Sequence, residues 1–355
     1  MRLINYLKKK QQLLSEETPF NLIPGPANYI QGENLISKAG KYCCFLGKSA
    51  IIICDNLIYK KYYSVLEESL RKSGILCGIF IFSGECCLEE VEQICSFARE
   101  KAHDFVIGMG GGKTLDTAKL TSKKMQSPLA LIATSAATCS AFTNVAIVYS
   151  KQGVYKDIVD IGKCADLTLV DETAMKDGPR ELLIAGIGDS FAKYYEAKLA
   201  FSFKIITKDI FSRMGLMAAG DMMKVIKNSK KTNEIIAANI VLNGFVSTIG
   251  RESCSEVFAH AFTNGLSIVP ESRKVLHGYL AALGVVFQQK LLKLPFKDKA
   301  FYKKCKLPLK FKDLKFKPDE SNISRIANLI MNDDIVKYLY PDIKIERIIK
   351  ALKSL

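Results

Sequence analysis

A glycine-rich turn within residues 106–119, VIGMGGGKTLDTAK, carries the clearest chemical signal in the chain. An apolar strand is predicted to enter this turn and a helix to leave it. Glycines let a backbone approach a ligand closely, and a helix N-terminus offers unpaired N–H groups and a positive dipole to a phosphate. A P-loop is excluded because Ile107 replaces its first glycine, and G-x-G-x-x-G is excluded because Lys113 replaces its last. The turn predicts a phosphate site of another type, with a glycine turn that binds nothing as the alternative.

Asp55 directly follows another apolar run, SAIIIC at residues 49–54. An acid just past an early strand can accept hydrogen bonds from a ribose 2′-hydroxyl and would repel a 2′-phosphate. This position therefore favours NAD(H) over NADP(H). Aspartate is also a common helix N-cap, so a purely structural role stays open.

Two of the three histidines and one aspartate form a second candidate site. His260 lies in a helical run, EVFAHAFTNG, and His277 opens the next predicted helix, HGYLAALGVV. Neighbouring helices in a bundle can aim such side chains at one point, where Asp189 could join them. Two imidazoles and one carboxylate leave a fourth position open on a tetrahedral ion, as catalytic metal sites do. Ordinary helix histidines and a helix-capping aspartate are the alternative.

The local pattern gives three further expectations. Asp189 is expected to open its helix, because Gly186 and Gly188 precede it. The helix of His260 is expected to end at Gly265, since Asn-Gly is a usual C-terminal cap. The third histidine, His103, lies in the charged stretch REKAHD and is expected to face solvent.

The elements that must position these residues change in kind along the chain. Strand-like runs at residues 49–54, 78–82, 105–108 and 129–133 alternate with amphipathic stretches such as 62–73 and 88–101. This alternation predicts βαβ units and a mostly parallel sheet, covered on both faces. After the turn Asp177-Gly178-Pro179 the apolar spacing is helical. We therefore predict an α/β domain with a mostly parallel sheet at 1–178 and an all-helical domain at 179–355.

Composition and charge narrow the class of protein. Lys and Arg exceed Asp and Glu by 51 − 36 = 15, and the lysines of residues 290–317 supply much of this excess. A solvated face with apolar anchors is the expected structure there, with a nucleic-acid surface as the non-enzymatic alternative. The first residues, MRLINYLKKKQQLL, do not resemble a signal peptide, and the uncharged residues 125–150 fit a strand and loop better than a membrane helix. With no C-x-x-C among the cysteines, we expect a cytoplasmic protein with reduced thiols and no membrane partner.

Four segments together resemble the iron-containing alcohol dehydrogenase superfamily, in its glycerol dehydrogenase and hydroxycarboxylate dehydrogenase branch. They are GGGKTLDTAK, the TSAATC…YS segment, GIGDSFAKYYEA and AHA…NGL…HG, which occur in the order of that family. The likeness runs from residue 25 to about residue 289. It implies the fold of iron-containing alcohol dehydrogenases and dehydroquinate synthase. In that fold, residues 1–178 would be a Rossmann-like dinucleotide-binding domain and residues 179–355 an all-helical metal- and substrate-binding domain, with a cleft between them. The resemblance also implies an oligomer of two or more copies.

The resemblance also implies ligands for both sites. NAD(H) is favoured, with NADP(H) as the alternative. The divalent ion, with Zn²⁺ favoured and Fe²⁺ as the alternative, would be bound by Asp189, His260 and His277. Ala137 stands where glycerol dehydrogenases usually have a serine, so any contact there would be through the backbone. The implied cofactor-binding residues are Asp55, Gly110, Gly111, Gly112, Lys113, Asp116, Thr134, Thr138, Thr143, Val145 and Tyr149.

Departures from the family pattern bear on the substrate. Cys139 replaces an Asp that touches the polyol in glycerol dehydrogenases, and ATCSAF looks more like the hydroxycarboxylate enzymes, which reduce short 2-oxo acids. Lys193 lies one helical turn after Asp189 and could bind a substrate carboxylate, or pair with Asp189, or extend to solvent. Thr263 stands where relatives often have a second histidine, so a histidine proton relay is absent there.

These observations predict a metal-dependent NAD(P)H oxidoreductase that acts on a small alcohol or carbonyl, with a 2-hydroxy acid and its 2-oxo acid as the expected pair. Asp189, His260, His277 and Lys193 are the expected catalytic residues, and Cys139 and Lys193 the expected substrate contacts. No nucleic-acid partner is expected. A glycerol or other polyol dehydrogenase and, more distantly, a glycerol-1-phosphate dehydrogenase stay open as alternatives.

Overall fold

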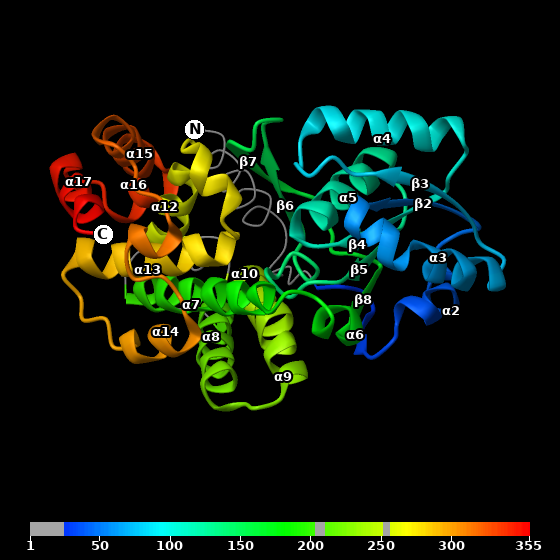
Figure 1. Ribbon diagram of the computed structural model, residues 1–355, viewed down its shortest axis with the longest axis horizontal. Helices are drawn as coiled ribbons and strands as arrows, with labels where there is room; N and C mark the ends of the chain where they lie inside the picture. Colours follow the sequence, from blue (N-terminus) through cyan, green and yellow to red (C-terminus); the bar gives the residue numbers. More distant parts are fainter. Residues whose placement is uncertain (1–24, 203–209, 251–255) are drawn as a thin grey trace.

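A parallel sheet forms the core of the N-terminal part of the protein. The computed structural model describes residues 25–202, 210–250 and 256–355. In these ranges six parallel strands lie in the order β1-β8-β5-β4-β2-β3 (Figure 1). All four strands expected from apolar runs are present, with shifts of up to two residues at their ends. The strands are β1 Tyr29–Gly32, β2 Ser49–Cys54, β3 Leu76–Ile81, β4 Phe105–Gly110, β5 Leu129–Ala133 and β8 Leu167–Asp171.

Helices cover both faces of this sheet, as the uninterrupted apolar strands predict. Helices α2 (Ala39–Cys43) and α3 (Asn56–Lys72) pack on one face, and α4 (Leu88–Glu100) and α5 (Gly112–Met125) on the other. Strand β2 serves both layers, because successive side chains of a strand point to opposite faces. Its Ala50, Ile52 and Cys54 join the first layer, and Ile51 and Ile53 join the second.

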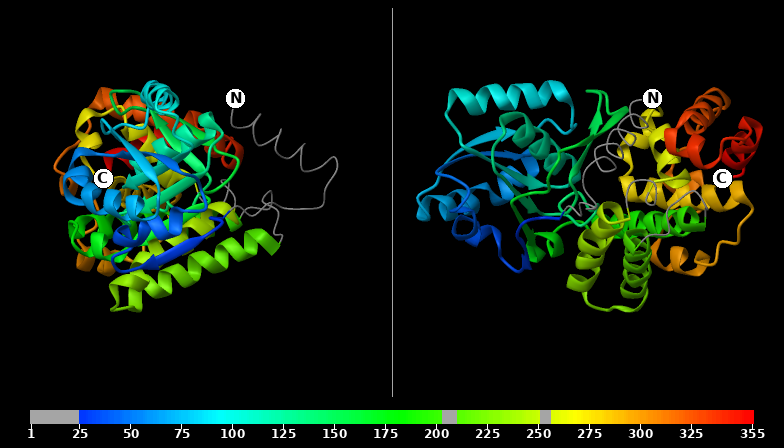
Figure 2. Two further views of the ribbon diagram at one scale, coloured as in Figure 1. Left: turned by 90° about the vertical axis from the view of Figure 1, so that its right-hand side faces the viewer. Right: turned by 180° about the vertical axis from the view of Figure 1, so that it is seen from behind.

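A two-stranded antiparallel hairpin, not expected from the sequence, joins the sheet to the helices. It consists of β6 (Val145–Tyr149) and β7 (Tyr155–Asp160). Two hydrogen bonds tie it to the helical part: Tyr155 N–H donates to Ser267 Oγ over 3.1 Å, and Arg273 Nη1 donates to the carbonyl of Gln152 over 2.7 Å. The hairpin thus lies between the two parts of the molecule (Figures 1 and 2).

Every described element after β8 is helical, which confirms the predicted class of the second half. The division into domains at residue 178 stays a prediction. At the centre of this helical half, the long helix α7 packs against the buried helix α13 (Figure 1). The helices are α6 Glu172–Lys176, α7 Arg180–Ser202, α8 Ile210–Asn228, α9 Thr232–Ala237, the π-helix η2 Ala238–Leu242, α10 Asn243–Thr248, α12 Phe258–Leu266, α13 His277–Leu292, α14 Lys299–Cys305, α15 Glu320–Asn332, α16 Asp334–Leu339 and α17 Ile345–Lys353. Short 3₁₀ turns are η1 Ile36–Lys38, η3 Pro270–Lys274 and η4 Phe311–Leu314.

Asp189 lies in the interior of α7 and does not open a helix, so that expectation is wrong. The two glycines before it serve close packing instead. A Cβ on Gly186 would lie 1.9 Å from the carbonyl oxygen of Ala136, and one on Gly188 would lie 2.2 Å from that of Gly278. The missing side chains let α7 contact the loop after β5 and the first turn of α13. The glycines therefore place Asp189 beside the elements that carry the rest of the site.

Two other local expectations are also wrong. Helix α12 continues through Gly265 to Leu266, and this glycine packs against Ile326 of α15. His103 is partly buried and not a solvated surface residue: its Nδ1 lies 2.9 Å from Ser49 Oγ, and its Nε2 is buried over Gly78. The ring of His103 thus packs against the sheet despite its charged neighbours, because Gly78 has no side chain to occupy that space.

The lysine-rich residues 290–317 have the expected apolar anchors. Tyr302, Leu307 and Phe311 are buried in the helical core, and the neighbouring lysines are mostly exposed. The N-terminal residues 1–14, on which the expected absence of a signal peptide rests, lie outside the described residues. Among the described helices, none has the length and apolar character needed to span a bilayer.

Candidate metal centre and cofactor site

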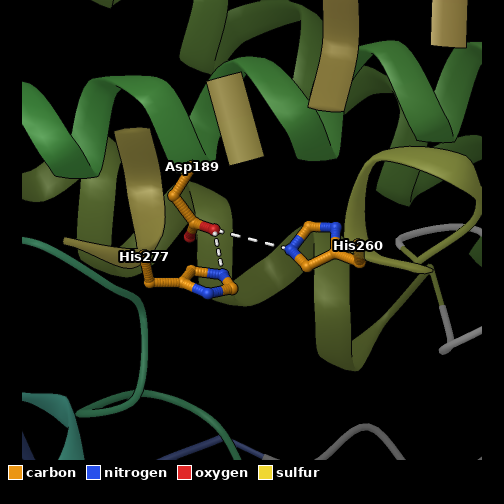
Figure 3. A group of neighbouring side chains, drawn as sticks. All are labelled: Asp189, His260 and His277. Atoms are coloured by element: carbon orange, nitrogen blue, oxygen red, sulfur yellow. Dashed lines mark ion pairs between the residues drawn. The ribbon is translucent and has the colours of Figure 1, made fainter. Parts of the chain in front are cut away.

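Three side chains from three helices of the C-terminal half converge at one point (Figure 3). Asp189 Oδ1 lies 3.3 Å from Nε2 of His277 and 3.5 Å from Nε2 of His260. All three candidate ligand atoms lie within 4.8 Å of one another. A tetrahedral ion with bonds of about 2.0–2.1 Å holds its ligand atoms about 3.3 Å apart. The donor set and its spacing therefore fit a divalent cation such as Zn²⁺.

His277 is the most exposed of the three candidate ligands. The side chains of Asp189 and His260 are 4% and 7% exposed, whereas that of His277 is 32% exposed. His277 can stand at the edge because it begins α13, where the chain enters the helix from the 3₁₀ turn η3. The three candidate ligands thus differ in exposure, and His277 is the one that solvent reaches most.

Glu196, which the sequence analysis did not single out, orients His260. Its Oε2 lies 2.5 Å from Nδ1 of His260, and its Oε1 accepts hydrogen bonds from the backbone N–H groups of His260 and Val257. A carboxylate on Nδ1 directs the lone pair of Nε2 toward the metal position, as in other metal sites with ligating histidines. Glu196 lies seven residues after Asp189, two helical turns on the same face, and this spacing could have revealed it.

The contacts of Asp189 and His260 shift the pKa values of both side chains. Burial opposes ionisation of Asp189, but the hydrogen bonds from His260 and His277 outweigh it and keep its pKa well below the ordinary range. Burial likewise opposes a charge on His260, but the Glu196 carboxylate outweighs it and raises the His260 pKa to about 10. A cation that binds Nε2 must therefore displace a proton.

Lys193 is buried and paired with a residue that the sequence analysis also missed. Its Nζ lies 3.1 Å from Oε1 of Glu256, and its side chain is 5% exposed. Burial opposes its charge, but the Glu256 carboxylate outweighs burial and raises the pKa of Lys193. The sequence also left open that Lys193 pairs with Asp189 or extends to solvent, and the side chain does neither.

Cys139 lies in the loop after β5 and is buried. Burial, followed by the charge of Asp189, raises the pKa of its thiol to about 11. The side chain is therefore neutral at physiological pH. Where an aspartate at this position would add a negative charge beside the metal position, Cys139 adds none.

The glycine-rich turn has the predicted strand–turn–helix geometry. Gly111 caps α5, which begins at Gly112, and a Cβ on Gly112 would lie 2.8 Å from Oγ1 of Thr138. Thr134 continues β5 beside the turn, with its N–H donating to the carbonyl of Gly110 over 3.1 Å. The turn and the loop that carries Thr138 thus form one surface at the carboxyl end of the parallel strands, where ligands bind in open α/β sheets.

Lys113 projects from the first turn of α5 but does not offer an unpaired charge. Its Nζ lies 2.7 Å from both carboxylate oxygens of Glu85 and 5.2 Å from the centre of the Tyr149 ring. The structure therefore brings together Lys113 and Tyr149, two of the predicted cofactor residues. Since Glu85 neutralises the lysine, the backbone N–H groups of the turn are the main groups left to meet a phosphate.

Asp116, Thr143 and Val145 meet in a buried network around Lys119. Lys119 Nζ lies 3.0 Å from Asp116 Oδ1, 3.1 Å from Ser140 Oγ, 3.3 Å from Thr143 Oγ1 and 2.8 Å from the carbonyl oxygen of Val145. The remaining oxygen of Asp116 accepts from the backbone N–H of Ile147. This network joins α5 to the loop of Cys139 and to the hairpin, so it fixes the positions of three of the residues expected to bind the cofactor.

Asp55 caps α3, which is the structural role left open by the sequence. Its Oδ1 accepts hydrogen bonds from the backbone N–H groups of Leu57 and Ile58, over 2.8 and 2.9 Å. The cap uses only this oxygen. Oδ2 is not part of the cap, so the residue can hold the helix and also receive a hydroxyl.

Comparison with known proteins gives the family. The family model of the iron-containing alcohol dehydrogenases matches residues 26–172. Hydroxycarboxylate dehydrogenase A of Escherichia coli (strain K12) is 32% identical over 295 residues, which cover 77% of this chain and 79% of that protein. This chain belongs to the iron-containing alcohol dehydrogenase family. Membership of this family makes it an alcohol oxidoreductase.

Other members of the iron-containing alcohol dehydrogenase family share the fold and the branch. Glycerol dehydrogenase of Pseudomonas putida is 29% identical over 278 residues, which cover 75% of this chain and 76% of that protein. The solved structure of a probable glycerol dehydrogenase from Sinorhizobium meliloti 1021 matches with a TM-score of 0.83 at 24% identity. It covers 94% of this chain and 98% of that chain, so the fold is the same along nearly the whole length.

Proposed function

We propose that this alcohol oxidoreductase uses NAD(H) and a divalent cation to interconvert a short 2-hydroxy acid and its 2-oxo acid. The observation that carries the proposal is the convergence of Asp189 Oδ1 with the two histidine Nε2 atoms at the spacing of a tetrahedral ion. Two nitrogens and one oxygen favour Zn²⁺, with Fe²⁺ as the alternative.

The charges around the metal position support a divalent ion. Three carboxylates, Asp189, Glu196 and Glu256, lie with one ammonium, Lys193, in this region. With neutral imidazoles their sum is −3 + 1 = −2. Metal binding requires neutral imidazoles, so the proton on His260 is then no longer there to offset this charge. An uncompensated buried charge is costly, and a divalent cation would balance it.

The substrate end of the site favours an acid over a polyol. Cys139 is a neutral thiol where glycerol dehydrogenases are expected to carry an aspartate, so no fixed charge repels a carboxylate there. Lys193 supplies an ammonium one helical turn from Asp189. A carboxylate held by Lys193 would place the adjoining carbonyl toward the three ligand atoms.

This arrangement gives each of the named residues a role in the proposed reaction. A bound divalent ion supplies a Lewis acid for the substrate oxygen, and the nicotinamide supplies or receives the hydride. Asp189, His260 and His277 hold the ion, and Glu196 orients His260. The glycine turn would hold the cofactor diphosphate, and Asp55 Oδ2 would accept the ribose hydroxyl, which favours NAD(H).

A glycerol or polyol dehydrogenase is the second candidate. The name of the Pseudomonas putida relative points to it, and the pairing of Lys193 with Glu256 lowers the net charge offered to an acid. Neither activity requires a different metal site. The two differ only in what lies beyond the carbon that exchanges the hydride.

The deciding experiment follows NADH and NADPH absorbance with 2-oxo acids, ketones and dihydroxyacetone. Each assay is run with purified protein, after chelation, and after Zn²⁺ or Fe²⁺ is restored. We expect turnover of a 2-oxo acid with NADH that chelation abolishes and the metal restores. Turnover of dihydroxyacetone alone would establish the polyol activity, and chelator-resistant turnover would overturn the metal assignment.

A further inference from the structure

We infer that Glu256 is a specificity-determining residue, which sets the preference between acidic and neutral substrates by competing with the substrate carboxylate for Lys193. The inference rests on the proposed function for the position of the substrate. It adds a role for Glu256 in substrate specificity, and a size of effect that a binding experiment can measure.

The hydrogen bonds of Lys193 are incomplete. A lysine ammonium has three N–H donors. Within the described residues, Lys193 Nζ has one hydrogen-bond acceptor, Glu256 Oε1 at 3.1 Å, although the side chain is only 5% exposed. A charged group this deeply buried ordinarily has its donors satisfied. Two N–H donors are thus left for a molecule that enters the site.

Lys119, the other buried lysine of the site, provides the contrast. It has four oxygen acceptors between 2.8 and 3.3 Å, and its side chain is 1% exposed. All donors of Lys119 are therefore used by the fold. The difference indicates that Lys119 is structural, whereas Lys193 keeps donors for a ligand.

The position of Lys193 selects the class of ligand. It lies one helical turn from Asp189 on α7, and it is near enough to Cys139 for its positive charge to act on the pKa of that thiol. A ligand with an oxygen at the metal position can therefore reach the ammonium with a second polar group. A carboxylate two atoms away, as in a 2-oxo acid, matches both the charge and the donors of Lys193.

The carboxylate of Glu256 opposes the binding of a substrate carboxylate at Lys193. Its carboxylate already pairs with Lys193 and repels a second carboxylate beside the same ammonium, because like charges a few ångströms apart raise each other's energy. A neutral diol or ketone has no such repulsion. Removing the charge of Glu256 should thus strengthen binding of acids and leave binding of neutral substrates nearly unchanged.

The test uses Glu256→Gln in the full-length protein, loaded with one equivalent of Zn²⁺ and saturated with NADH. Glutamine keeps an oxygen that can accept from Lys193 but removes the charge. Binding of oxamate, a non-reacting analogue of a 2-oxo acid, and of glycerol is measured by titration of NADH fluorescence. We expect Glu256→Gln to bind oxamate about tenfold more tightly than the native protein. Glycerol affinity should stay within about twofold.

Three further variants separate the charge of Glu256 from its size and from the net charge of the protein. Glu256→Asp keeps the charge and should retain the native preference, and Lys193→Met should lose oxamate affinity but not glycerol affinity. Glu181→Gln removes an exposed charge on α7, the helix of Lys193, and should change neither value. Unchanged or weaker oxamate binding in Glu256→Gln would overturn the inference.

Failure of this inference and failure of the proposed function give different results. If the native protein reduces dihydroxyacetone and no 2-oxo acid, the proposed substrate is wrong, while a tighter oxamate complex of Glu256→Gln still supports the role of Glu256. If the native protein reduces 2-oxo acids and Glu256→Gln binds oxamate more weakly, the proposed function stands. Glu256 is then a residue that only positions Lys193.

Discussion

Asn243 donates a hydrogen bond from Nδ2 to Oδ2 of Asp189 over 2.9 Å, while the two histidines face Oδ1 of the same carboxylate. The two oxygens thus have separate tasks, one held by the protein and one turned to the metal position. Asn243 begins α10 directly after the π-helix η2, and π-helical turns often occur at functional sites. Asn239, one turn earlier, accepts from Ser190 and donates to the carbonyls of Ala136 and Leu183.

Asn243→Leu should weaken metal binding, since Asp189 would lose the contact that orients it. We expect the Zn²⁺ dissociation constant to rise about 10- to 100-fold, the usual effect of removing a group that holds a ligand. Competition with a fluorescent chelator measures it. NADH affinity should be unchanged, and Asn228→Leu, at the exposed end of α8, serves as the control. A metal affinity equal to that of the native protein would contradict the role of Asn243.

Glu196→Gln should also weaken metal binding, but through His260. Gln keeps the size of Glu196 and loses the charge that favours a proton on Nδ1 of His260. We expect a rise of at least about tenfold in the Zn²⁺ dissociation constant. Replacement of Zn²⁺ by Co²⁺ adds a spectroscopic readout, because a changed ligand geometry alters the visible absorption of the ion. Identical Co²⁺ spectra and affinities in both proteins would exclude this role.

His277→Ala should abolish turnover and leave NADH binding nearly intact. The side chain supplies one of the three candidate ligand atoms and is absent from the glycine turn that would hold the cofactor. Steady-state assays and NADH fluorescence titrations test the two parts separately, with circular dichroism as the control for folding. Retained activity together with lost NADH binding would reverse the assignment of this residue.

Lys119→Met should destabilise the fold as well as the cofactor site. The substitution leaves Asp116 ionised in a buried position without its cation, and breaking a buried pair in this way costs about 3–5 kcal/mol. Denaturant unfolding measures the loss. The double variant Lys119→Met with Asp116→Asn should recover part of it, since no unpaired charge is left. A loss below about 1 kcal/mol in the single variant would show that the network contributes little.

Asp333 gives a pH dependence of stability. Burial raises its pKa from 3.8 to about 6, although it accepts hydrogen bonds from the backbone N–H groups of Ile335 and Val336 as the N-cap of α16. Because the folded protein binds the proton of Asp333 more tightly than the unfolded chain does, this proton stabilises the fold below the unfolded pKa. The contribution is lost as the pH rises from about 4 through about 6. Asp333→Asn keeps a capping oxygen without the charge. Its melting temperature should exceed that of the native protein at pH 8, and the difference should shrink below pH 6.

Two substitutions of Asp55 can distinguish its role as the N-cap of α3 from its expected effect on the preference for NADH. Asp55→Asn should preserve the cap, because an asparagine oxygen also accepts from the N–H groups of α3, and should narrow the preference for NADH over NADPH by removing the charge. Asp55→Ala should in addition lower the free energy of unfolding by about 1 kcal/mol. Dissociation constants for both cofactors, with thermal unfolding, test both expectations. An unchanged ratio of the two constants in both variants would leave Asp55 with the cap alone.

Short-range patterns predicted much of this protein. The apolar runs that became β2, β3, β4 and β5 could be recognised because a strand buried on both faces needs apolar side chains at successive positions. The glycine turn, the change to helical spacing after residue 178 and the three candidate ligands were also visible, since residue type and local spacing are enough for them. Hairpin β6–β7 was not, because both strands are only partly buried and charged residues interrupt β7 (YKDIVD).

Tertiary structure decided which residues surround the candidate ligands. Gly186 and Gly188 looked like the end of a loop, but they lie inside α7, where their missing side chains admit Ala136 and Gly278. Glu256 is 63 residues from Lys193, and Asn243 is 54 residues from Asp189. A hydrogen bond over such a separation depends on how helices pack, which local preference does not encode. Local sequence patterns are therefore enough to predict the class of fold and the chemical groups of the candidate site. Only the packing of the helices brings each of these groups to the side chain that it contacts.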